Sequence, residues 1–162
     1  MSNKPQSPTS CGRRPPRAGE TPLAALAPDG FEMTVLAIIR HLFTSFANPA
    51  GHGWLKAVTI AECALASEAP GALFLDIVRV VQGVRLSRRS TLAFSNPECV
   101  CCAAVLTEPE RHLMQAMMAV RRGHIGIART HAMLLCEGGD IEPLILALNA
   151  LPKPSKIAEA VC

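Results

Sequence analysis

Three cysteines gather in one short stretch of the chain, at Cys99, Cys101 and Cys102. The two residues between Cys99 and Cys102 leave a spacing that lets both thiolates bind one tetrahedral metal ion. One such pair supplies only half of a zinc site, so the other ligands must come from elsewhere in the fold. We take Cys136 as the first of these, and Cys101 is able to replace either of its neighbours. The sequence therefore suggests a structural zinc ion (Zn²⁺) that clamps the turn near residue 100 to the helix bearing Cys136.

The fourth ligand of this site and the identity of the metal stay open. The residues that compete for the fourth place are Cys63, His112, His124 and His131. Available histidines favour zinc over an iron–sulfur cluster. Without a metal, Cys63 and Cys136 would be small apolar residues buried on helix faces, and the cluster would be a thiol-rich loop. A third alternative is a redox switch that uses the clustered thiols.

Helices are the elements that must position these cysteines. Apolar residues recur at helical spacing in six segments, which proline and glycine separate. The predicted helices span residues 31–48, 54–68, 72–88, 108–122, 125–137 and about 140–151. Asp29 with Glu32, and Thr107 with Glu110, match the capping-box pattern that starts a helix. We predict an all-α fold, a compact bundle of about six helices, in a single domain over residues 29–162.

The N-terminal residues 1–28 have a different composition, rich in proline, serine and arginine. Such a segment buries too little apolar surface to order itself, so we expect a disordered tail. Residues 1–22 carry four basic side chains and one acidic one, and the rest of the chain carries twelve of each. The folded part is therefore neutral, whereas domains that bind DNA backbones usually carry a basic excess on the fold. Nucleic acid is a partner that the sequence allows but does not favour.

The sequence also bears on location and chemistry. It holds no uninterrupted apolar run of about 20 residues and no apolar signal-peptide core, so we expect a cytoplasmic protein without a membrane partner. Seven cysteines, an odd number, do not fit a fully paired disulfide framework. Neither a phosphate-binding glycine loop nor a nucleophile elbow is present. We therefore do not expect an enzyme.

The high apolar content shapes the functional hypothesis. Of the residues, 49% are hydrophobic and only 18% are charged, which indicates surface that is covered by a partner or a second copy. We predict a small non-catalytic accessory or regulatory protein that acts through protein binding. One alternative is a DNA-associated transcriptional regulator that uses the basic tail and the arginines beside the cysteines. The other alternative is a thiol-based redox sensor.

Overall fold

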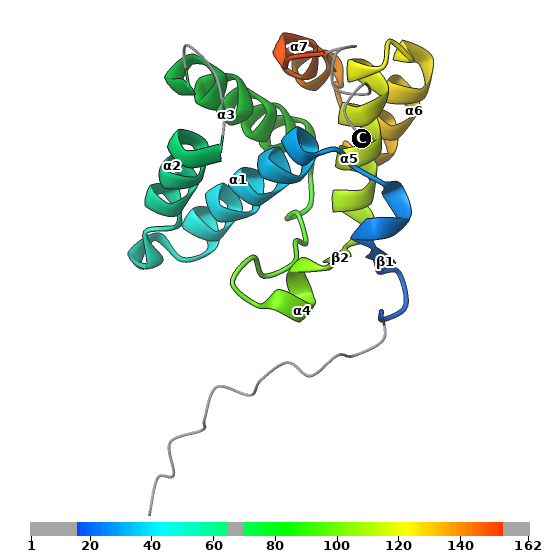
Figure 1. Ribbon diagram of the computed structural model, residues 1–162. Helices are drawn as coiled ribbons and strands as arrows, with labels where there is room; N and C mark the ends of the chain where they lie inside the picture. Colours follow the sequence, from blue (N-terminus) through cyan, green and yellow to red (C-terminus); the bar gives the residue numbers. More distant parts are fainter. Residues whose placement is uncertain (1–15, 65–69, 154–162) are drawn as a thin grey trace, which may run out of the picture.

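The computed structural model describes residues 16–64 and 70–153, which contain seven α-helices and almost no strand. The helices are α1 (Gly30–Ala47), α2 (Gly53–Ala64), α3 (Pro70–Ser87), α4 (Val100–Ala103), α5 (Glu108–Arg121), α6 (Ile125–Leu135) and α7 (Glu142–Ala150). The predicted all-α bundle is confirmed (Figure 1). Six of the helices match the predicted ones, and α4 is additional. Three parts of these predictions lie outside the described part of the chain. They are residues 1–15 of the predicted tail, residues 65–68 of the second predicted helix and residues 154–162 of the predicted domain.

Two groups of helices share one core. α1 packs against α2 and α3, α5 packs against α6, and α7 contacts both α3 and α5. In Figure 1, α1, α2 and α3 lie on the left, α5 and α6 lie on the right, and α7 lies at the top. Ile38, Ile77, Met114 and Leu148 come from four of these helices, and all are fully buried in one apolar cluster. The groups are therefore held together mainly by burial of apolar side chains.

Two capping boxes start α1 and α5, as the sequence predicts. The Asp29 carboxylate accepts the Glu32 backbone N–H at 2.7 Å, and the Glu32 carboxylate accepts the Asp29 N–H at 2.9 Å. Thr107 and Glu110 make the same reciprocal pair, at 3.3 and 2.9 Å. Both helices thus begin where their first N–H groups find local acceptors.

A glycine allows α3 to approach α7 closely. A Cβ atom at Gly83 would lie 2.9 Å from the Cα and 3.1 Å from the backbone nitrogen of Leu144. Carbon atoms in ordinary contact lie about 3.5–4.0 Å apart, so a larger residue does not fit here without moving the helices. The position explains why a residue of low helix propensity stands in the middle of α3.

In the described part of the chain the first regular element is β1, which lies before the predicted boundary at residue 28. Strand β1 (Thr21–Pro22) pairs antiparallel with β2 (Val105–Leu106), and a 3₁₀ helix, η1 (Leu23–Leu26), follows it. The Leu23 N–H donates to the Ala104 carbonyl at 2.9 Å, and Leu23 and Leu26 pack against the core. The predicted disordered tail is therefore too long at its C-terminal end, because these two leucines have core surface to cover.

The segment between α3 and α5 is held by a buried ion pair. Arg40 of α1 donates from Nε to Oε1 of Glu110 at 2.7 Å, and both side chains are almost inaccessible to solvent. The same guanidinium donates to the Ala103 carbonyl at 2.8 Å and to the Val105 carbonyl at 2.7 Å. The Ser95 N–H completes the cluster by donating to Glu110 at 3.1 Å. One arginine thus fixes the end of α4 and the start of β2, two elements that the hydrophobic pattern does not predict.

A second ionic cluster joins the start of α1 to the end of α5. Arg121 donates to Glu32 at 2.6 Å and to Asp29 at 2.8 Å, while its Nε binds the Pro152 carbonyl at 2.8 Å. Its guanidinium also lies 4.6 Å from the centre of the Phe31 ring. Arg121 and Glu32 are both buried, so these charges satisfy each other within the protein.

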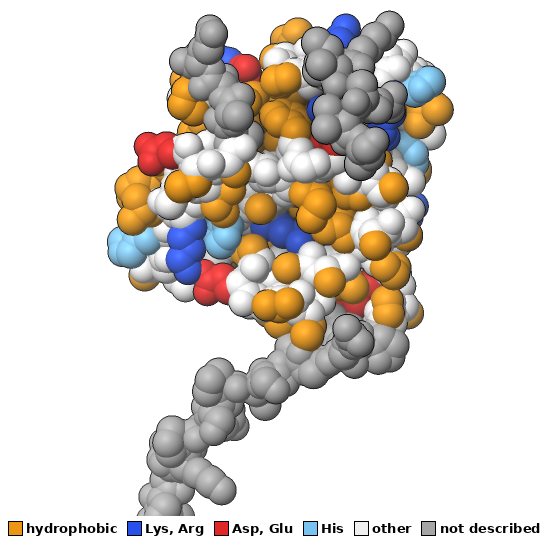
Figure 2. Space-filling model, viewed as in Figure 1, with side chains coloured by type: hydrophobic (Ala, Val, Ile, Leu, Met, Phe, Trp, Pro, Cys, Tyr) orange, Lys and Arg blue, Asp and Glu red, His pale blue; other side chains and the backbone are white. Residues whose placement is uncertain are grey.

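The outer surface carries many apolar side chains. Figure 2 shows hydrophobic groups spread among charged ones over the face in view. Among the large hydrophobic residues that the structure describes, Leu86, Val100 and Leu146 are the most exposed. Within residues 16–64 and 70–153, no helix has both the length and the apolar character needed to cross a membrane.

Candidate functional site

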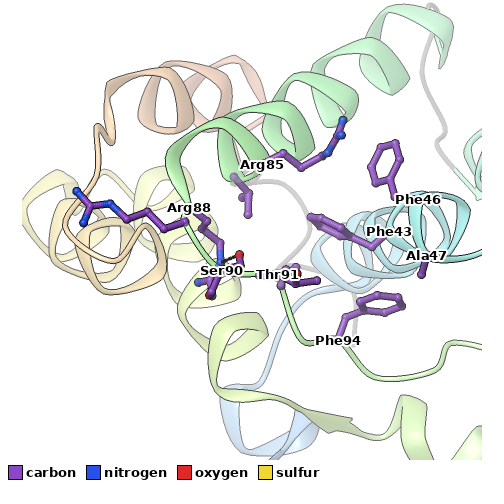
Figure 3. Close-up of a pocket in the computed structure, with 11 residues that line it drawn as sticks. Phe43, Phe46, Ala47, Arg85, Arg88, Ser90, Thr91 and Phe94 are labelled. Atoms are coloured by element: carbon purple, nitrogen blue, oxygen red, sulfur yellow. Dashed lines mark hydrogen bonds between the residues drawn. The ribbon is translucent and has the colours of Figure 1, made fainter.

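A pocket of about 350 Å³ opens where the C-terminal ends of α1 and α3 meet the segment that follows α3. Figure 3 shows Phe43, Phe46 and Ala47 of α1 at the pocket, with Phe94 below Phe43 in this view. The full lining consists of Phe43, Phe46, Ala47, Val84, Arg85, Arg88, Arg89, Ser90, Thr91, Leu92 and Phe94. We call it the aromatic–arginine pocket.

Aromatic rings make its apolar wall. Phe43 and Phe46 lie one helical turn apart on α1, and their rings meet edge to face with centroids 6.0 Å apart. The Phe94 ring lies 5.9 Å from Phe43 on the other side. Phe43 is buried and fixes the wall to the core, whereas Phe46 is 48% exposed. Rings arranged in this way offer both a face and an edge to an incoming apolar group.

Arginine side chains give the pocket its charge. The Arg85 guanidinium lies 4.1 Å from the centre of the Phe46 ring and also donates to Gln82 at 2.9 Å. Arg89 is exposed. No acidic residue lines the pocket, and neither Arg85 nor Arg89 forms a side-chain ion pair with any described residue. The pocket therefore combines an apolar wall with uncompensated positive charge.

Arg88 has a structural role beside the pocket. Figure 3 shows its side chain pointing away from the aromatic rings. It donates to the Glu137 carboxylate at 2.8 Å and to the Leu135 carbonyl. The same carboxylate accepts the backbone N–H groups of Arg89 and Ser90, each at 3.0 Å. These contacts fasten the turn after α3 to the end of α6.

Glu137 is charged throughout the neutral range. Hydrogen bonds from Ser90, supported by the N–H of Arg89 and the charge of Arg88, lower the pKa of its carboxyl below the usual value of 4.5. Glu137 adopts a left-handed backbone conformation with φ of 56°, just after Cys136, the C-cap of α6. The turn at Arg88, Arg89 and Ser90 forms the polar edge of the pocket. Its shape thus depends on Glu137, which lies 47 to 49 positions later in the chain.

The predicted metal ligands form no recognisable metal-binding group within the described part of the chain. The described residues include Cys99, Cys101, Cys102 and Cys136, yet no group of three or more His, Cys, Asp or Glu among them is arranged to hold a metal ion. The predicted clamp of Cys99, Cys102 and Cys136 therefore gains no support from the geometry. Sequence spacing identified the local pair, but it gave no information on the distance between the turn and α6.

Each cysteine has its own setting. Cys99 is the N-cap of α4, and its Sγ accepts the Cys102 N–H at 3.4 Å. Cys101 follows within α4. Cys136 ends α6 and is fully buried in the core cluster beside Ser87, and this burial raises the pKa of its thiol. Burial as a small apolar residue, the alternative expected for Cys136 and Cys63, is thus found for Cys136, whereas Cys63 is exposed.

The histidines proposed as the fourth ligand form a different arrangement. His112 of α5 and His131 of α6 lie with their Nδ1 atoms 3.0 Å apart. His124 is the N-cap of α6, and it lines a separate hollow with His131. Two imidazoles facing each other act as one hydrogen-bonded pair, in which one nitrogen donates and the other accepts.

The aromatic–arginine pocket was not indicated by the sequence. Phe43 and Phe46 fit the inward face of the predicted helix, and Arg88 and Arg89 fit the positive charges favoured at a helix C-terminus. The one available signal is the combination of these two groups near the ends of neighbouring helices. No protein-family model, curated protein or solved structure matches this chain.

Proposed function

We propose that this protein is a non-catalytic accessory protein that binds another protein through the aromatic–arginine pocket. The occupant is a partner segment that carries an apolar or aromatic side chain next to carboxylates. The observation that supports this proposal is the pairing of an exposed Phe46 ring with the Arg85 guanidinium above it. Aromatic residues and arginine are the side chains most enriched where binding energy concentrates in protein interfaces.

Charge complementarity identifies the chemistry of the partner. Arg85 and Arg89 lie at the pocket without an ion pair among the described residues, and the lining contains no acid. A carboxylate from the partner would therefore meet positive charge and no repulsion. An apolar side chain beside that carboxylate would cover the rings of Phe46 and Phe94.

The openness of the pocket favours a protein segment over a small molecule. Phe46, Ala47, Arg85 and Thr91 all remain exposed around it. Small-molecule sites usually enclose most of their ligand's surface. A shallow pocket with exposed walls suits one side chain of a longer chain, whose remaining residues make further contacts outside.

Fluorescence anisotropy with a defined peptide tests the proposal. The probe is a short fluorescein-labelled peptide in which Glu alternates with Leu and Phe, and its partner probe carries Gln in place of Glu. We expect the acidic peptide to bind more tightly, with an affinity that falls as salt is added. Phe46→Ala and Arg85→Gln should each weaken binding by about tenfold or more.

Two control variants distinguish binding at the pocket from nonspecific binding of the peptide to the protein surface. Trp54→Ala removes another half-exposed aromatic residue, on α2, and Arg79→Gln removes another exposed arginine of α3. Neither residue lines the pocket, so neither change should alter the affinity. Equal binding by all variants, or equal binding of both peptides, overturns the proposal.

Sedimentation analysis tests a second occupant. If Phe46→Ala converts a dimer of the unmodified protein into a monomer, the pocket is filled by a second copy. That result replaces the assignment to a partner protein.

A further inference from the structure

Cys99 and Cys102 lie at the two ends of the first turn of α4, and their arrangement suggests a chemical property separate from protein binding. Cys99 is the N-cap, with an extended backbone (φ −98°, ψ 110°), and Cys102 stands three residues later in the helix. The Cys99 sulfur folds back over this turn, because it accepts the Cys102 N–H at 3.4 Å. The sulfur of Cys99 therefore already lies next to the backbone of Cys102.

This arrangement is close to that of a disulfide. Side chains three residues apart on a helix have Cβ atoms about 5–6 Å apart, and disulfides join Cβ atoms about 3.8 Å apart. Rotation about the side-chain bonds and a small change at the N-cap close this gap. α4 has only four residues, so no long helix resists the adjustment.

The two ends of α4 are held differently. At its C-terminal end the Ala103 carbonyl is bound to the buried guanidinium of Arg40 at 2.8 Å. At the other end, the turn before α4 is closed by the Glu98 N–H, which donates to the Asn96 side chain at 2.9 Å on the exposed surface. Cys99 and Cys102 are themselves partly exposed. The two cysteines therefore lie at a partly exposed turn, while the contact with Arg40 holds the other end of α4.

We propose that Cys99 and Cys102 form a reversible dithiol–disulfide pair, which exchanges with small-molecule disulfides such as glutathione disulfide. The Cys99 thiolate attacks one sulfur of glutathione disulfide, the S–S bond breaks, and one glutathione leaves as a thiolate. The Cys102 thiolate then attacks the Cys99 sulfur of the mixed disulfide and expels the second glutathione. Two electrons pass from the protein thiols to the oxidant, and the two thiol protons end on two molecules of glutathione.

The order of attack follows from the hydrogen bond. A thiolate is the attacking form, and backbone N–H groups directed at sulfur stabilise it. Cys99 receives such a bond from Cys102, so Cys99 is the attacking residue and Cys102 the resolving one. This inference depends on α4 alone and does not require the aromatic–arginine pocket to bind a partner.

The test uses the full-length protein in glutathione buffers of stepped oxidation. Samples are quenched in acid, and remaining thiols are alkylated. Peptides are then mapped by mass spectrometry. We expect the unmodified protein to lose two hydrogens in the peptide containing residues 99–102, without a lasting glutathione adduct. Reduction with excess glutathione should restore both thiols.

Single variants assign the roles of the two sulfurs. Cys102→Ser should trap glutathione on Cys99, because no resolving thiol remains. Cys101→Ser should keep the disulfide, and so should Cys63→Ser. Circular dichroism confirms that each variant is folded, and the mapping of the unmodified protein does not depend on any variant. A disulfide that requires Cys101, a disulfide between two chains, or a persistent adduct on the unmodified protein overturns the proposal.

Discussion

Arg40 and Glu110 form an ion pair in the interior of the protein, although they lie 70 residues apart in the chain. Their side chains are 4% and 2% exposed. Around this pair the structure gathers carbonyl oxygens from Ala103 and Val105 and the backbone N–H of Ser95. The pair therefore joins α1 and α5 to three points of the segment between α3 and α5.

Removing one charge of this pair should destabilise the fold strongly. Glu110→Ala leaves the Arg40 guanidinium buried without a counter-charge, and it also removes an acceptor from Ser95. We expect a loss of about 3–5 kcal/mol in the free energy of unfolding, measured by urea denaturation. Lys56→Ala, which breaks the exposed pair between Lys56 and Glu98, serves as the control and should have little effect. Similar losses in both variants would contradict the central role of the buried pair.

Two glycines in helices should respond to alanine in opposite directions. At Gly83 the new methyl group meets the Leu144 backbone at 2.9 Å, so Gly83→Ala should cost about 1–3 kcal/mol by overpacking. At Gly126 of α6 nothing lies within 4 Å, so Gly126→Ala should stabilise by up to about 1 kcal/mol through helix propensity. Thermal denaturation compares the two. A stabilised Gly83→Ala would show that α3 and α7 are not in close contact.

Stability should fall in mildly acidic solution because of the histidine pair. Burial, with the positive charge of Arg111 as a further cause, lowers the pKa of both His112 and His131 below the usual 6.5. The unfolded chain therefore takes up protons more readily than the folded one as the pH falls below about 6.5. The free energy of unfolding should be highest above that pH and should decline as the pH drops through the lowered values.

Urea denaturation at a series of pH values measures this decline. Replacing both residues of the pair, by His112→Gln and His131→Gln, should make it shallower and leave the part due to His41, whose pKa is also lowered by burial. His52→Asn changes a histidine in an exposed turn and should leave the slope unchanged. An unchanged slope in the double variant would assign the pH dependence to other groups.

The cap of α1 should be separable from its ion pair. Asp29→Ser keeps a side-chain oxygen for the Glu32 N–H but loses the contact with Arg121. Asp29→Ala loses both, so it should cost about 1 kcal/mol more than Asp29→Ser in urea denaturation. Equal losses in the two variants would mean that the cap contributes nothing.

Local signals account for the part of the fold that was predictable. α1 and α5 begin at capping boxes that are complete within four residues of sequence, and their apolar faces repeat at helical spacing. β1, η1, α4 and β2 were missed for the opposite reason. They are short, and distant partners such as Arg40 hold them in place. A pattern confined to neighbouring residues does not contain those partners.

The candidate sites differ in the same way. The spacing of Cys99 and Cys102 was visible in the sequence, and the contact between them is local. The proposed link to Cys136 depends on two distant segments meeting, which sequence spacing does not establish, and the structure shows that Cys136 is packed in the core. The Arg85 guanidinium lies 4.1 Å from the centre of the Phe46 ring, because the C-terminal ends of α1 and α3 come together. In the sequence, Phe46 fits the apolar spacing of its predicted helix, and no local pattern links it to Arg85.

The pairing of Thr21 with Leu106 sets a limit on how the protein can be shortened for expression. A version that starts at Asp29, where helical periodicity begins, loses β1 and the bond from Leu23 to Ala104. It thereby uncovers the flank of the segment that carries the cysteine pair. The shortest fragment that keeps this pairing starts before Thr21. A tag joined at that point lies next to β2.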